Sequence, residues 1–293
     1  AGVVKIHGTS KAVAASVDSS AVYCFAHPLS GGKQIVCENW RNLISVGAKP
    51  IAITNCLNFG NPENPDIMGE FAECLIGIKE ACEYLNYPVV SGNVSFYNGT
   101  NKKNISPTPV IGGVGLIQKF KSPMNHKFKK ENSTVLLIGK TNGHLEQSVF
   151  FEEVYSIFEG RPPEVNLVNE KNNGESVLEI IKNQLINSVH DVSNGGLLVA
   201  LAEMSMETSF GVKINKPKKL TNLYEYFFGE DQSRYILEID GNNLKKVEKI
   251  LKNNNIFYEN IGSTQKDYFE INGEMKINIK ELFKINNQWY NNY

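Results

Sequence analysis

The sequence predicts an α/β protein built from two domains. Short apolar runs alternate with stretches in which apolar residues recur at helical spacing, a pattern typical of α/β folds. The chain has 293 residues, of which 41% are hydrophobic, enough to bury two cores. Residues 119–133 are basic, polar and poor in apolar side chains, so we place a domain boundary there. We expect domains at residues 1–125 and 133–293.

The charge balance gives no reason to expect a polyanionic partner. The formal net charge is -1, so we expect neither nucleic acid nor an anionic membrane as a partner. Apolar runs are too short to span a bilayer, and the first residues lack the basic and apolar regions of a signal peptide. We expect a cytoplasmic protein, and the start at Ala1 rather than Met suggests a piece of something longer.

Cysteine and histidine patterns do not support nucleophilic or zinc chemistry. The 5 cysteines all fall in the first third of the chain and form no Cys-x-x-Cys pair, which is typical of reduced, mostly buried thiols. The 5 histidines are scattered, and none lies in a Cys-His or Ser-His-Asp motif. We therefore expect neither a catalytic triad nor a zinc site.

The first domain is predicted to open with a hairpin. Residues 3–6 and 12–17 have the composition of two strands, and the polar segment between them has that of a turn. Asp18 follows the second strand directly, so its carboxylate would lie at a strand end.

A helix is predicted at residues 33–46, where apolar side chains recur at helical spacing after a turn at Gly31-Gly32. Glu38 and Asn42 are four residues apart and project from one face of this helix. They form either an exposed polar stripe or a pair of ligands.

The stretch from Ile51 to Pro65 begins as a run suited to a buried strand and then breaks into a polar loop. This loop is either a ligand loop or a plain surface connection. An amphipathic helix is predicted to follow at residues 68–85.

A second buried strand is predicted at Val89-Val90, and it leads into a small and polar turn. Gly92 in this turn would let a ligand approach the backbone closely. Asn93 and Ser95 offer side-chain oxygens at alternating positions. A further strand is expected at residues 107–117, with a break at its paired glycines.

In the second domain, strands are predicted at residues 135–138 and 186–189, with helices at 176–184 and 197–206. The polar turn before the last helix contains Asp191, Ser193 and a Gly-Gly pair. A strand, a glycine turn and a helix N-terminus make a ready anion site, because free amides and the helix dipole point at one spot. Such turns also occur for packing alone, so both interpretations stay open.

The remaining segments are predicted to be turn and surface. Residues 227–234 form a dense polar cluster before a strand at 235–239, and a salt-bridged turn is the simplest interpretation. From Lys245 onward the chain is rich in Asn and Lys, which we interpret as a solvated surface.

Hard oxygen ligands recur near the predicted strand and helix ends. They are Asp18, Glu38, Asn42, Asn93 and Asp191. Carboxylate and amide oxygens near a nucleotide suit Mg²⁺, which takes part of its coordination shell from phosphate. The residues therefore predict magnesium-nucleotide binding.

Four ordered motifs support a family resemblance that covers nearly the whole chain. They are GAKPIAITNCLNFGNP from Gly47, PVVSGNVS from Pro88, HDVSNGGL from His190 and FGEDQSRY from Phe228. Together they resemble phosphoribosylformylglycinamidine synthase, in the C-terminal half of its synthetase subunit. The resemblance implies an aminoimidazole ribonucleotide synthetase-like unit of α+β type, with mixed sheets flanked by helices.

The family reaction is an ATP-dependent carbon–nitrogen ligation in purine biosynthesis. Formylglycinamide ribonucleotide is phosphorylated on its formamide oxygen, and ammonia derived from glutamine displaces the phosphate to give the amidine. The catalytic histidine of the family lies in the N-terminal half, and the surroundings of His27-Pro28 do not match it. The resemblance therefore implies that this half contains no catalytic residue and is inactive alone.

The resemblance also assigns roles to single residues. It implies that Asn55 and Gly92 contact ATP, Asn93 contacts Mg²⁺ and Ser95 contacts the substrate. The family usually has Asp at the position of Asn55, so here the charge is lost while the shape is kept. An auxiliary site for a nucleotide such as ADP would use Ser193, with Mg²⁺ ligands at Asp18, Glu38, Asn42 and Asp191.

The partners implied are the N-terminal half of the same subunit, a glutaminase subunit and a small bridging subunit. A homodimer of the isolated half is a further expectation. Two alternatives stay open: a non-catalytic half that binds nucleotide only to stabilise the fold, and a self-sufficient aminoimidazole ribonucleotide synthetase.

Overall fold

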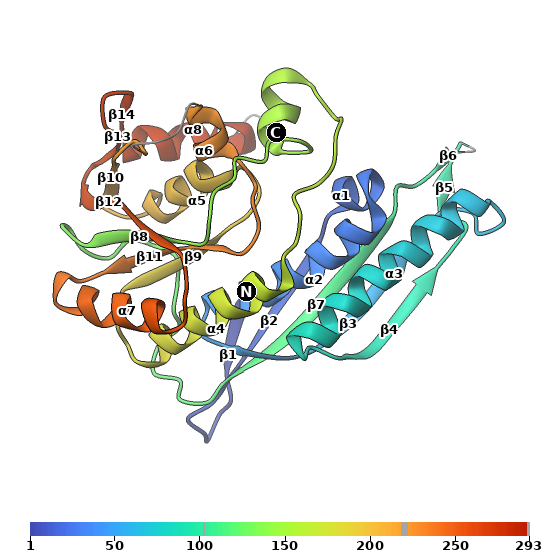
Figure 1. The fold of residues 1–293 in the computed structure, drawn as a ribbon, viewed down its shortest axis with the longest axis horizontal. Helices are drawn as coiled ribbons and strands as arrows, with labels where there is room; N and C mark the ends of the chain where they lie inside the picture. Colours follow the sequence, from blue (N-terminus) through green and yellow to red (C-terminus); the bar gives the residue numbers. More distant parts are fainter. Residues whose placement is uncertain (102, 218–221, 292–293) are drawn as a thin grey trace. The chain divides into compact units, whose positions relative to one another are not determined.

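The structure is a computed structural model that describes residues 1–101, 103–217 and 222–291. The chain forms two compact units, residues 1–123 with 145–174, and residues 124–144 with 175 onward. Each unit has its own main sheet (Figure 1). In the described ranges, no helix combines the length and the apolar character needed to cross a membrane.

The first unit contains a five-stranded sheet in the order β1-β2-β7-β3-β4. The strands are β1 (Gly2–Lys5), β2 (Ala12–Ser19), β3 (Lys49–Asn58), β4 (Val89–Ser95) and β7 (Thr108–Ile117). Among its described strands, β3 and β4 run parallel and the other neighbours are antiparallel. The expected hairpin of the first two strands is confirmed, and β7 continues through its paired glycines without the expected break.

Helices cover one face of this sheet. They are α1 (Ala21–Ala26), α2 (Pro28–Ser45) and α3 (Pro65–Leu85), and Figure 1 shows α2 and α3 side by side. The predicted turn at Gly31-Gly32 is wrong, because both residues lie inside α2 and are buried. A Cβ on Gly32 would lie 2.3 Å from the carbonyl oxygen of Cys74 on α3. The glycine therefore allows the two helices to approach closely.

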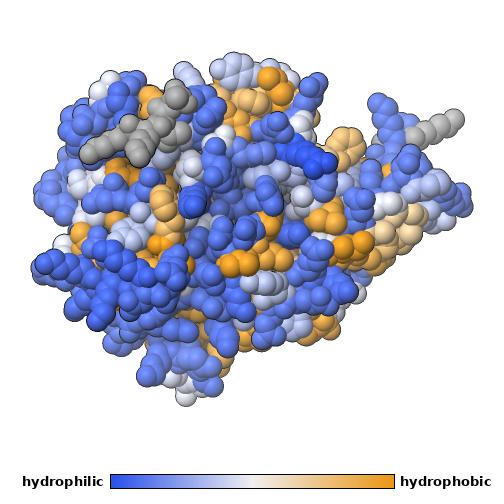
Figure 2. Space-filling view, viewed as in Figure 1, coloured by the Kyte–Doolittle hydropathy of each residue, from blue (hydrophilic) through white to orange (hydrophobic). Residues whose placement is uncertain are grey.

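The opposite face of the sheet is not covered by the helices of this unit. Val89 and Val90 are 44% and 71% exposed, so the prediction of a buried strand there is wrong. The reason is position, because β4 is the edge strand of the sheet and pairs only with β3 among the described strands. Other exposed apolar residues are Val4, Val17, Ile51 and Val114. Figure 2 shows apolar side chains among the polar ones on one surface of the molecule.

A buried ion pair joins helix α2 to residues 145–174, the segment that returns to the first unit. Arg41 on α2 donates from Nη1 to Glu170 Oε1 at 2.6 Å, and both side chains are 0% exposed. Glu170 lies in the first turn of α4 (Leu167–Lys182), which follows the short π-helix η1 (Phe151–Tyr155). Burial, and then the Glu170 carboxylate, raise the pKa of Cys37 well above its usual range. Cys37 is thus a neutral thiol. The expectation of reduced, mostly buried cysteines is confirmed, since Cys24, Cys74 and Cys82 are also free and buried.

The second unit contains a seven-stranded sheet in the order β14-β13-β10-β12-β8-β11-β9. The strands are β8 (Thr134–Ile138), β9 (Ser188–Val192), β10 (Phe210–Ile214), β11 (Arg234–Ile239), β12 (Tyr258–Lys266), β13 (Tyr268–Ile271) and β14 (Met275–Asn278). In the described ranges of this unit, β10 and β13 run parallel and the other neighbouring strands are antiparallel. The short hairpin of β5 (Gly99–Thr100) and β6 (Lys103–Asn104) belongs to the first unit.

In the part of the second unit that the structure describes, the helices are the second half of α4, α5 (Gly196–Ser205), α6 (Leu223–Phe228), α7 (Gly241–Asn253) and α8 (Ile279–Asn291). The prediction that the chain from Lys245 onward is only solvated surface is wrong. Val247 and Leu251 on α7 are fully buried, and Phe269 joins the core of the unit. These apolar residues keep helical or strand spacing, but the many Asn and Lys residues between them mask the pattern.

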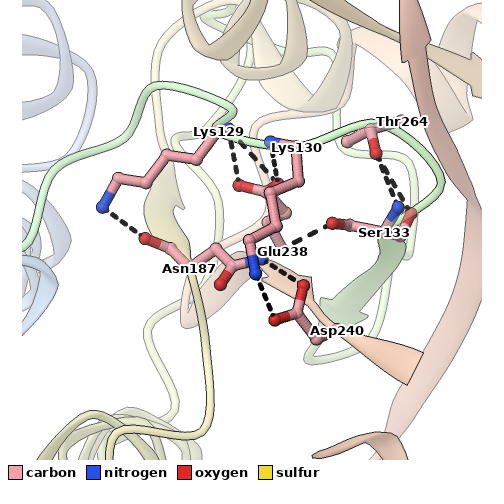
Figure 3. A network of polar contacts seen from close by, with 7 residues as sticks. All are labelled: Lys129, Lys130, Ser133, Asn187, Glu238, Asp240 and Thr264. Atoms are coloured by element: carbon pink, nitrogen blue, oxygen red, sulfur yellow. Dashed lines mark hydrogen bonds and ion pairs between the residues drawn. The ribbon is translucent and has the colours of Figure 1, made fainter. Parts of the chain in front are cut away.

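A buried carboxylate fixes the end of the basic stretch at residues 119–133, called the linker below, to the second sheet (Figure 3). Glu238 on β11 is 0% exposed and accepts hydrogen bonds from the backbone amides of Lys129 and Lys130. Ser188 on β9 donates to the same carboxylate at 2.8 Å. The Lys130 ammonium pairs with Asp240 at 2.6 Å. The basic stretch is thus ordered at its C-terminal end, where buried charge meets backbone donors.

Replacing Glu170 tests the anchor of the first unit. Glu170→Ala should lower the free energy of unfolding by about 3 kcal/mol or more, because Arg41 would keep a buried charge without this partner. The matched control is Glu83→Ala, which removes the exposed Lys79–Glu83 pair at 3.8 Å and should cost less than about 1 kcal/mol. Urea denaturation measures both. Equal costs for the two variants would show that the buried pair is not an anchor.

Candidate functional site

The candidate residues are divided between the two units. The first unit holds Asp18, Glu38, Asn42, Asn55, Gly92, Asn93 and Ser95, and the second holds Asp191 and Ser193. Within the first unit they form two groups, one at β3 and β4 and one between β2 and α2.

Asn55 and Gly92 are direct neighbours on the parallel strands β3 and β4. A Cβ on Gly92 would lie 1.9 Å from Asn55 Oδ1, so the Asn55 side chain occupies the space that any larger residue would fill. Asn55 points to the helix-covered face, like the buried Ile53 and Leu57 two positions away on the same strand. The absence of a side chain at position 92 is therefore a requirement of the Asn55 conformation.

Asn93 and Ser95 lie on the opposite face of the sheet. Strand register places Asn93 beside Cys56 and Ser95 beside Asn58, all facing away from the helices. The carbonyl of Ser95 accepts hydrogen bonds from the amide of Phe59 and from Asn98 Nδ2 at 3.0 and 2.9 Å. These hydrogen bonds hold the end of β4 in place. Because Asn55 and Asn93 lie on opposite faces of the sheet, a single ligand could contact both only by passing around the edge strand β4.

A cavity of about 430 Å³ lies beside Asn55, between α3 and the start of β4. Apolar and polar side chains both line it; the lining residues are Asn55, Leu75, Ile78, Lys79, Cys82, Glu83, Asn86, Tyr87, Pro88 and Val89. This size lies within the range of small-molecule sites. Asn55 therefore borders a space that a ligand could enter.

The second group is organised around the Asp18 carboxylate. Asn42 Nδ2 donates to Asp18 Oδ1 at 2.8 Å, and Asn39 Nδ2 and Ser16 Oγ donate to Asp18 Oδ2 at 2.7 and 2.8 Å. These three hydrogen bonds hold both carboxylate oxygens of Asp18 in place. Glu38 lies on the same face of α2 as Asn42 and accepts a hydrogen bond from Gln34.

This group offers only oxygen ligands to a cation. Among the described residues, no cluster of three or more His, Cys, Asp or Glu side chains could hold a metal ion. Asp18, Glu38 and Asn42 supply two carboxylates and one amide. Such a mixed set suits a hard cation that takes further ligands from phosphate.

Sequence reasoning missed Asn39, which is central to this group. It is fully buried, donates to Asp18 and to the carbonyl of Ser16, and accepts from the Tyr87 hydroxyl at 2.7 Å. Burial, and then the Asp18 carboxylate, raise the pKa of Tyr87 well above its usual range, so the hydroxyl remains a donor. The available signal was one amide on the otherwise apolar side of helix α2, next to Trp40.

In the second unit, Asp191 lies in β9 and is buried, while Ser193 lies in the turn that precedes α5. The expected anion site is occupied by the chain itself, because the amide of Gly195 donates to Glu230 Oε1 at 2.7 Å. Gly195 has the positive φ of 77° that favours glycine at this helix start. Of the two interpretations of the turn, packing explains this amide. A nucleotide role for Ser193 remains a prediction.

A charged histidine lies beside Asp191. His190 contacts Glu203 Oε2 through Nε2 at 3.0 Å and Asp191 Oδ1 through Nδ1 at 3.5 Å. Burial alone would lower the pKa of His190, but the two carboxylates outweigh burial and raise the pKa to about 9. The His126 ring, 5.1 Å away between centroids, has its pKa lowered by burial and by His190.

The raised pKa of His190 predicts a pH-dependent stability. The pKa of His190 is higher in the folded protein than its value of about 6.5 in the unfolded chain. Protonated His190 therefore adds to the free energy of unfolding in full below pH about 6.5, and this stabilisation is lost as pH rises through about 9. Urea denaturation over a pH series should show this loss, and Glu203→Gln should reduce it. Glu281→Gln, on exposed α8, is the control. An unchanged profile in Glu203→Gln would contradict the assignment.

Two family models match the chain in tandem. The model described as AIR synthase related protein, N-terminal domain, matches residues 1–117. The model described as AIR synthase related protein, C-terminal domain, matches residues 130–271.

Curated relatives match over the whole chain. It is 55% identical over 293 residues to the phosphoribosylformylglycinamidine synthase subunit PurL of Pelagibacter ubique and 44% identical to that of Rhodopseudomonas palustris strain BisB5. In both cases 100% of this chain is covered but only 40% of the relative. The chain thus spans well under half the length of the curated relatives it matches.

Solved structures share the fold. Thermotoga maritima PurL complexed with ATP matches with a TM-score of 0.77 at 17% identity, covering 97% of this chain and 46% of that chain. Thiamine-monophosphate kinase from Stenotrophomonas maltophilia matches with a TM-score of 0.65 at 12% identity, and the match covers 93% of this chain and 92% of the kinase chain. The predicted mixed α/β fold with helices flanking the sheets is confirmed. The chain belongs to the AIR synthase related family and consists of an N-terminal domain followed by a C-terminal domain of that family.

Proposed function

We propose that this chain is the C-terminal half of a phosphoribosylformylglycinamidine synthase subunit and supplies part of an active site that the N-terminal half completes. The observation that carries the proposal is the identity of 55% over the whole chain to a PurL subunit of which the match covers only 40%. The uncovered face of the first sheet supports it, since Asn93 and Ser95 project there. An exposed apolar sheet face is typical of a surface that another domain covers.

In the proposed reaction, the formamide oxygen of formylglycinamide ribonucleotide attacks the γ-phosphorus of ATP and releases ADP. Ammonia then adds to the activated carbon, and phosphate leaves to give the amidine. Protein groups contribute mainly by positioning these reactants and by offsetting developing charge. We assign ATP contacts to Asn55 and Gly92 and a substrate contact to Ser95, with the catalytic histidine in the N-terminal half.

The cavity beside Asn55 supports the ATP contact in the first unit. Asn55 Oδ1 is held over Gly92, so an amide group rather than a carboxylate faces a ligand in this cavity. An amide can both donate and accept a hydrogen bond, which suits the edge of a nucleotide base or a ribose hydroxyl. The contact is therefore compatible with the loss of the charge that the family usually has there.

Mg²⁺ fits the oxygen ligands in both groups. Asn93 would contact the Mg²⁺ that accompanies ATP. Asp18, Glu38, Asn42 and Asp191 would serve an auxiliary site that holds a nucleotide such as ADP, with Ser193 beside it. When bound, Mg²⁺ neutralises phosphate charge, and the chain's part is to present fixed oxygens, as Ser16, Asn39 and Asn42 do for Asp18.

The proposed partners follow from the same assignment. They are the N-terminal half of the subunit, a glutaminase subunit that delivers ammonia, and a small bridging subunit, in the cytoplasm. Without the N-terminal half, the uncovered sheet face offers a surface for a homodimer of this half.

Complementation tests the proposal. The chain alone should make no amidine, and adding the separately produced N-terminal half of a PurL subunit with ATP, Mg²⁺ and ammonia should restore synthesis. Asn93→Ala and Ser95→Ala should lower the restored rate by about 100-fold or more, because both residues would contact the reactants. Glu281→Gln, on exposed α8, should leave the rate unchanged.

The outcomes separate the alternatives. No synthesis with both halves folded and associated would contradict the proposal. Tight Mg²⁺-ATP binding that is abolished by Asp191→Ala but insensitive to Asn93→Ala would support a nucleotide that only stabilises the fold. Ring closure by the chain alone would support a self-sufficient aminoimidazole ribonucleotide synthetase.

A further inference from the structure

A buried polar turn in the second unit links two loops at one end of its sheet. The turn comprises residues 229–234, between α6 and β11, and we call it the 229–234 turn. Its charged side chains are almost completely buried, with Glu230 1%, Asp231 5% and Arg234 0% exposed. Burying three charged groups costs free energy unless they are hydrogen-bonded or paired. A turn that only joined a helix to a strand would not need them, so their contacts indicate a further role.

Strand register places the two loops side by side. Residue Ile138 at the end of β8 is opposite Tyr235, and Val192 at the end of β9 is opposite Arg234. The loop at 139–144 and the loop at 193–195 therefore leave the same end of the sheet, on either side of the start of β11. The second of these loops follows Asp191 and contains Ser193.

Each carboxylate of the turn binds the backbone of a different loop. Glu230 Oε1 accepts from the amide of Gly195 at 2.7 Å. Asp231 Oδ2 accepts from the amides of Asn142 and Gly143 at 2.9 and 2.8 Å. Charged acceptors make strong hydrogen bonds to backbone donors in a buried setting. The Glu230 carboxylate thus binds the 193–195 loop and the Asp231 carboxylate binds the 139–144 loop, and the Glu230 amide also donates to the His144 carbonyl of the second of these at 2.9 Å.

Arg234 holds the turn itself. It donates from Nε to the carbonyl of Asp231 at 3.0 Å, from Nη2 to the carbonyl of Gly229 at 2.5 Å and from Nη1 to Thr141 Oγ1 at 3.1 Å. The guanidinium thus fixes the backbone of the turn at both ends and also reaches the 139–144 loop. Its rigid planar fork suits this bridging role better than a flexible ammonium group would.

We propose that Glu230 and Asp231 are positioning residues, each of which sets the geometry of one loop at the nucleotide-facing end of the second unit. Glu230 fixes the turn that carries Ser193, and Asp231 fixes the loop at 139–144. The assignment of a nucleotide to this end rests on the proposed function, whereas the positioning of the loops rests on the contacts alone.

The arrangement also determines how an anion can approach. The Glu230 carboxylate already satisfies the Gly195 amide and offsets the dipole of α5, so a bare phosphate meets a negative charge there. A nucleotide would instead reach this end as its Mg²⁺ complex, through the side chains of Asp191 and Ser193. The turn thus selects against free phosphate.

Hydrogen exchange at single amides of the full chain tests the positioning. Glu230→Ala should raise exchange at Gly195 by about tenfold or more, while Asn142 and Gly143 stay within about twofold. Asp231→Ala should give the converse. Glu230→Gln should stay near wild type, since its amide oxygen can still accept, and Glu230→Asp is a milder variant if Glu230→Ala does not fold. Asp240→Ala, at the opposite end of β11, is the control.

Two results would overturn the proposal. One is a uniform rise in exchange across both loops and the core amides of β8 and β11, which indicates global destabilisation only. The other is unchanged exchange at Gly195 in both Glu230→Ala and Glu230→Asp.

Adding Mg²⁺-ADP separates this inference from the proposed function. In wild type, Mg²⁺-ADP should slow exchange at residues 193–195, whereas inorganic phosphate should not. If Mg²⁺-ADP has no effect, the auxiliary nucleotide site is contradicted, while the loop-specific exchange in the variants still decides the positioning roles. Slower exchange with phosphate alone would overturn the selection against free phosphate.

Discussion

The carboxylate of Asp18 holds helix α2 against the first sheet, and the rest of that unit depends on where α2 lies. Donors from β2 and from two positions of the helix meet on this one group. The same helix packs closely against α3 at Gly32 and binds the start of α4 through Arg41. A displacement of α2 would therefore disturb the candidate ligands on it and the α3 side of the cavity together.

Buried carboxylates with neutral or backbone donors recur in the second unit. Glu238 binds the end of the linker, and Glu230 and Asp231 bind two loops at the other end of β11. Each arrangement fixes a loop through hydrogen bonds from backbone amides to a buried carboxylate. Buried carboxylates thus hold the end of the linker and the loops at 139–144 and 193–195 in place. Asp191 and Ser193 are the side chains that we propose contact a nucleotide at this end of the second unit.

Much of the fold follows from local sequence patterns. Apolar spacing predicted α2 and α3, helix propensity predicted α5, and short apolar runs predicted β8 and β11, because these elements bury one face or both against their own unit. Exposure of β4 was not predictable in this way, since an edge strand and a central strand have the same local composition. Gly32 was interpreted as a turn because only the neighbouring helix, distant in sequence, reveals its packing role.

The site residues likewise fall into those that the local sequence predicts and those that only the structure or a family resemblance reveals. Asp18, Glu38 and Asn42 could be selected from residue type and spacing, whereas the assignment of Asn55 needed a family resemblance. Asn39 escaped because a buried amide on a helix looks like any polar residue until its partners Asp18 and Tyr87 are known. Residues 227–234 were interpreted as a salt-bridged turn, and that stays a prediction; the hydrogen bonds that Glu230 and Asp231 accept from two loops distant in sequence could not be predicted from local patterns.

The most direct test of a nucleotide site in the first unit is an amide NMR titration of the chain with Mg²⁺-ATP. The account predicts that the resonances of Asn55, Gly92 and Asn93 shift in a saturable way, with weaker binding in Gly92→Ala, where a Cβ would meet the Asn55 side chain. Saturable shifts confined to residues around Asp191 and Ser193, with none at β3 and β4, would contradict it.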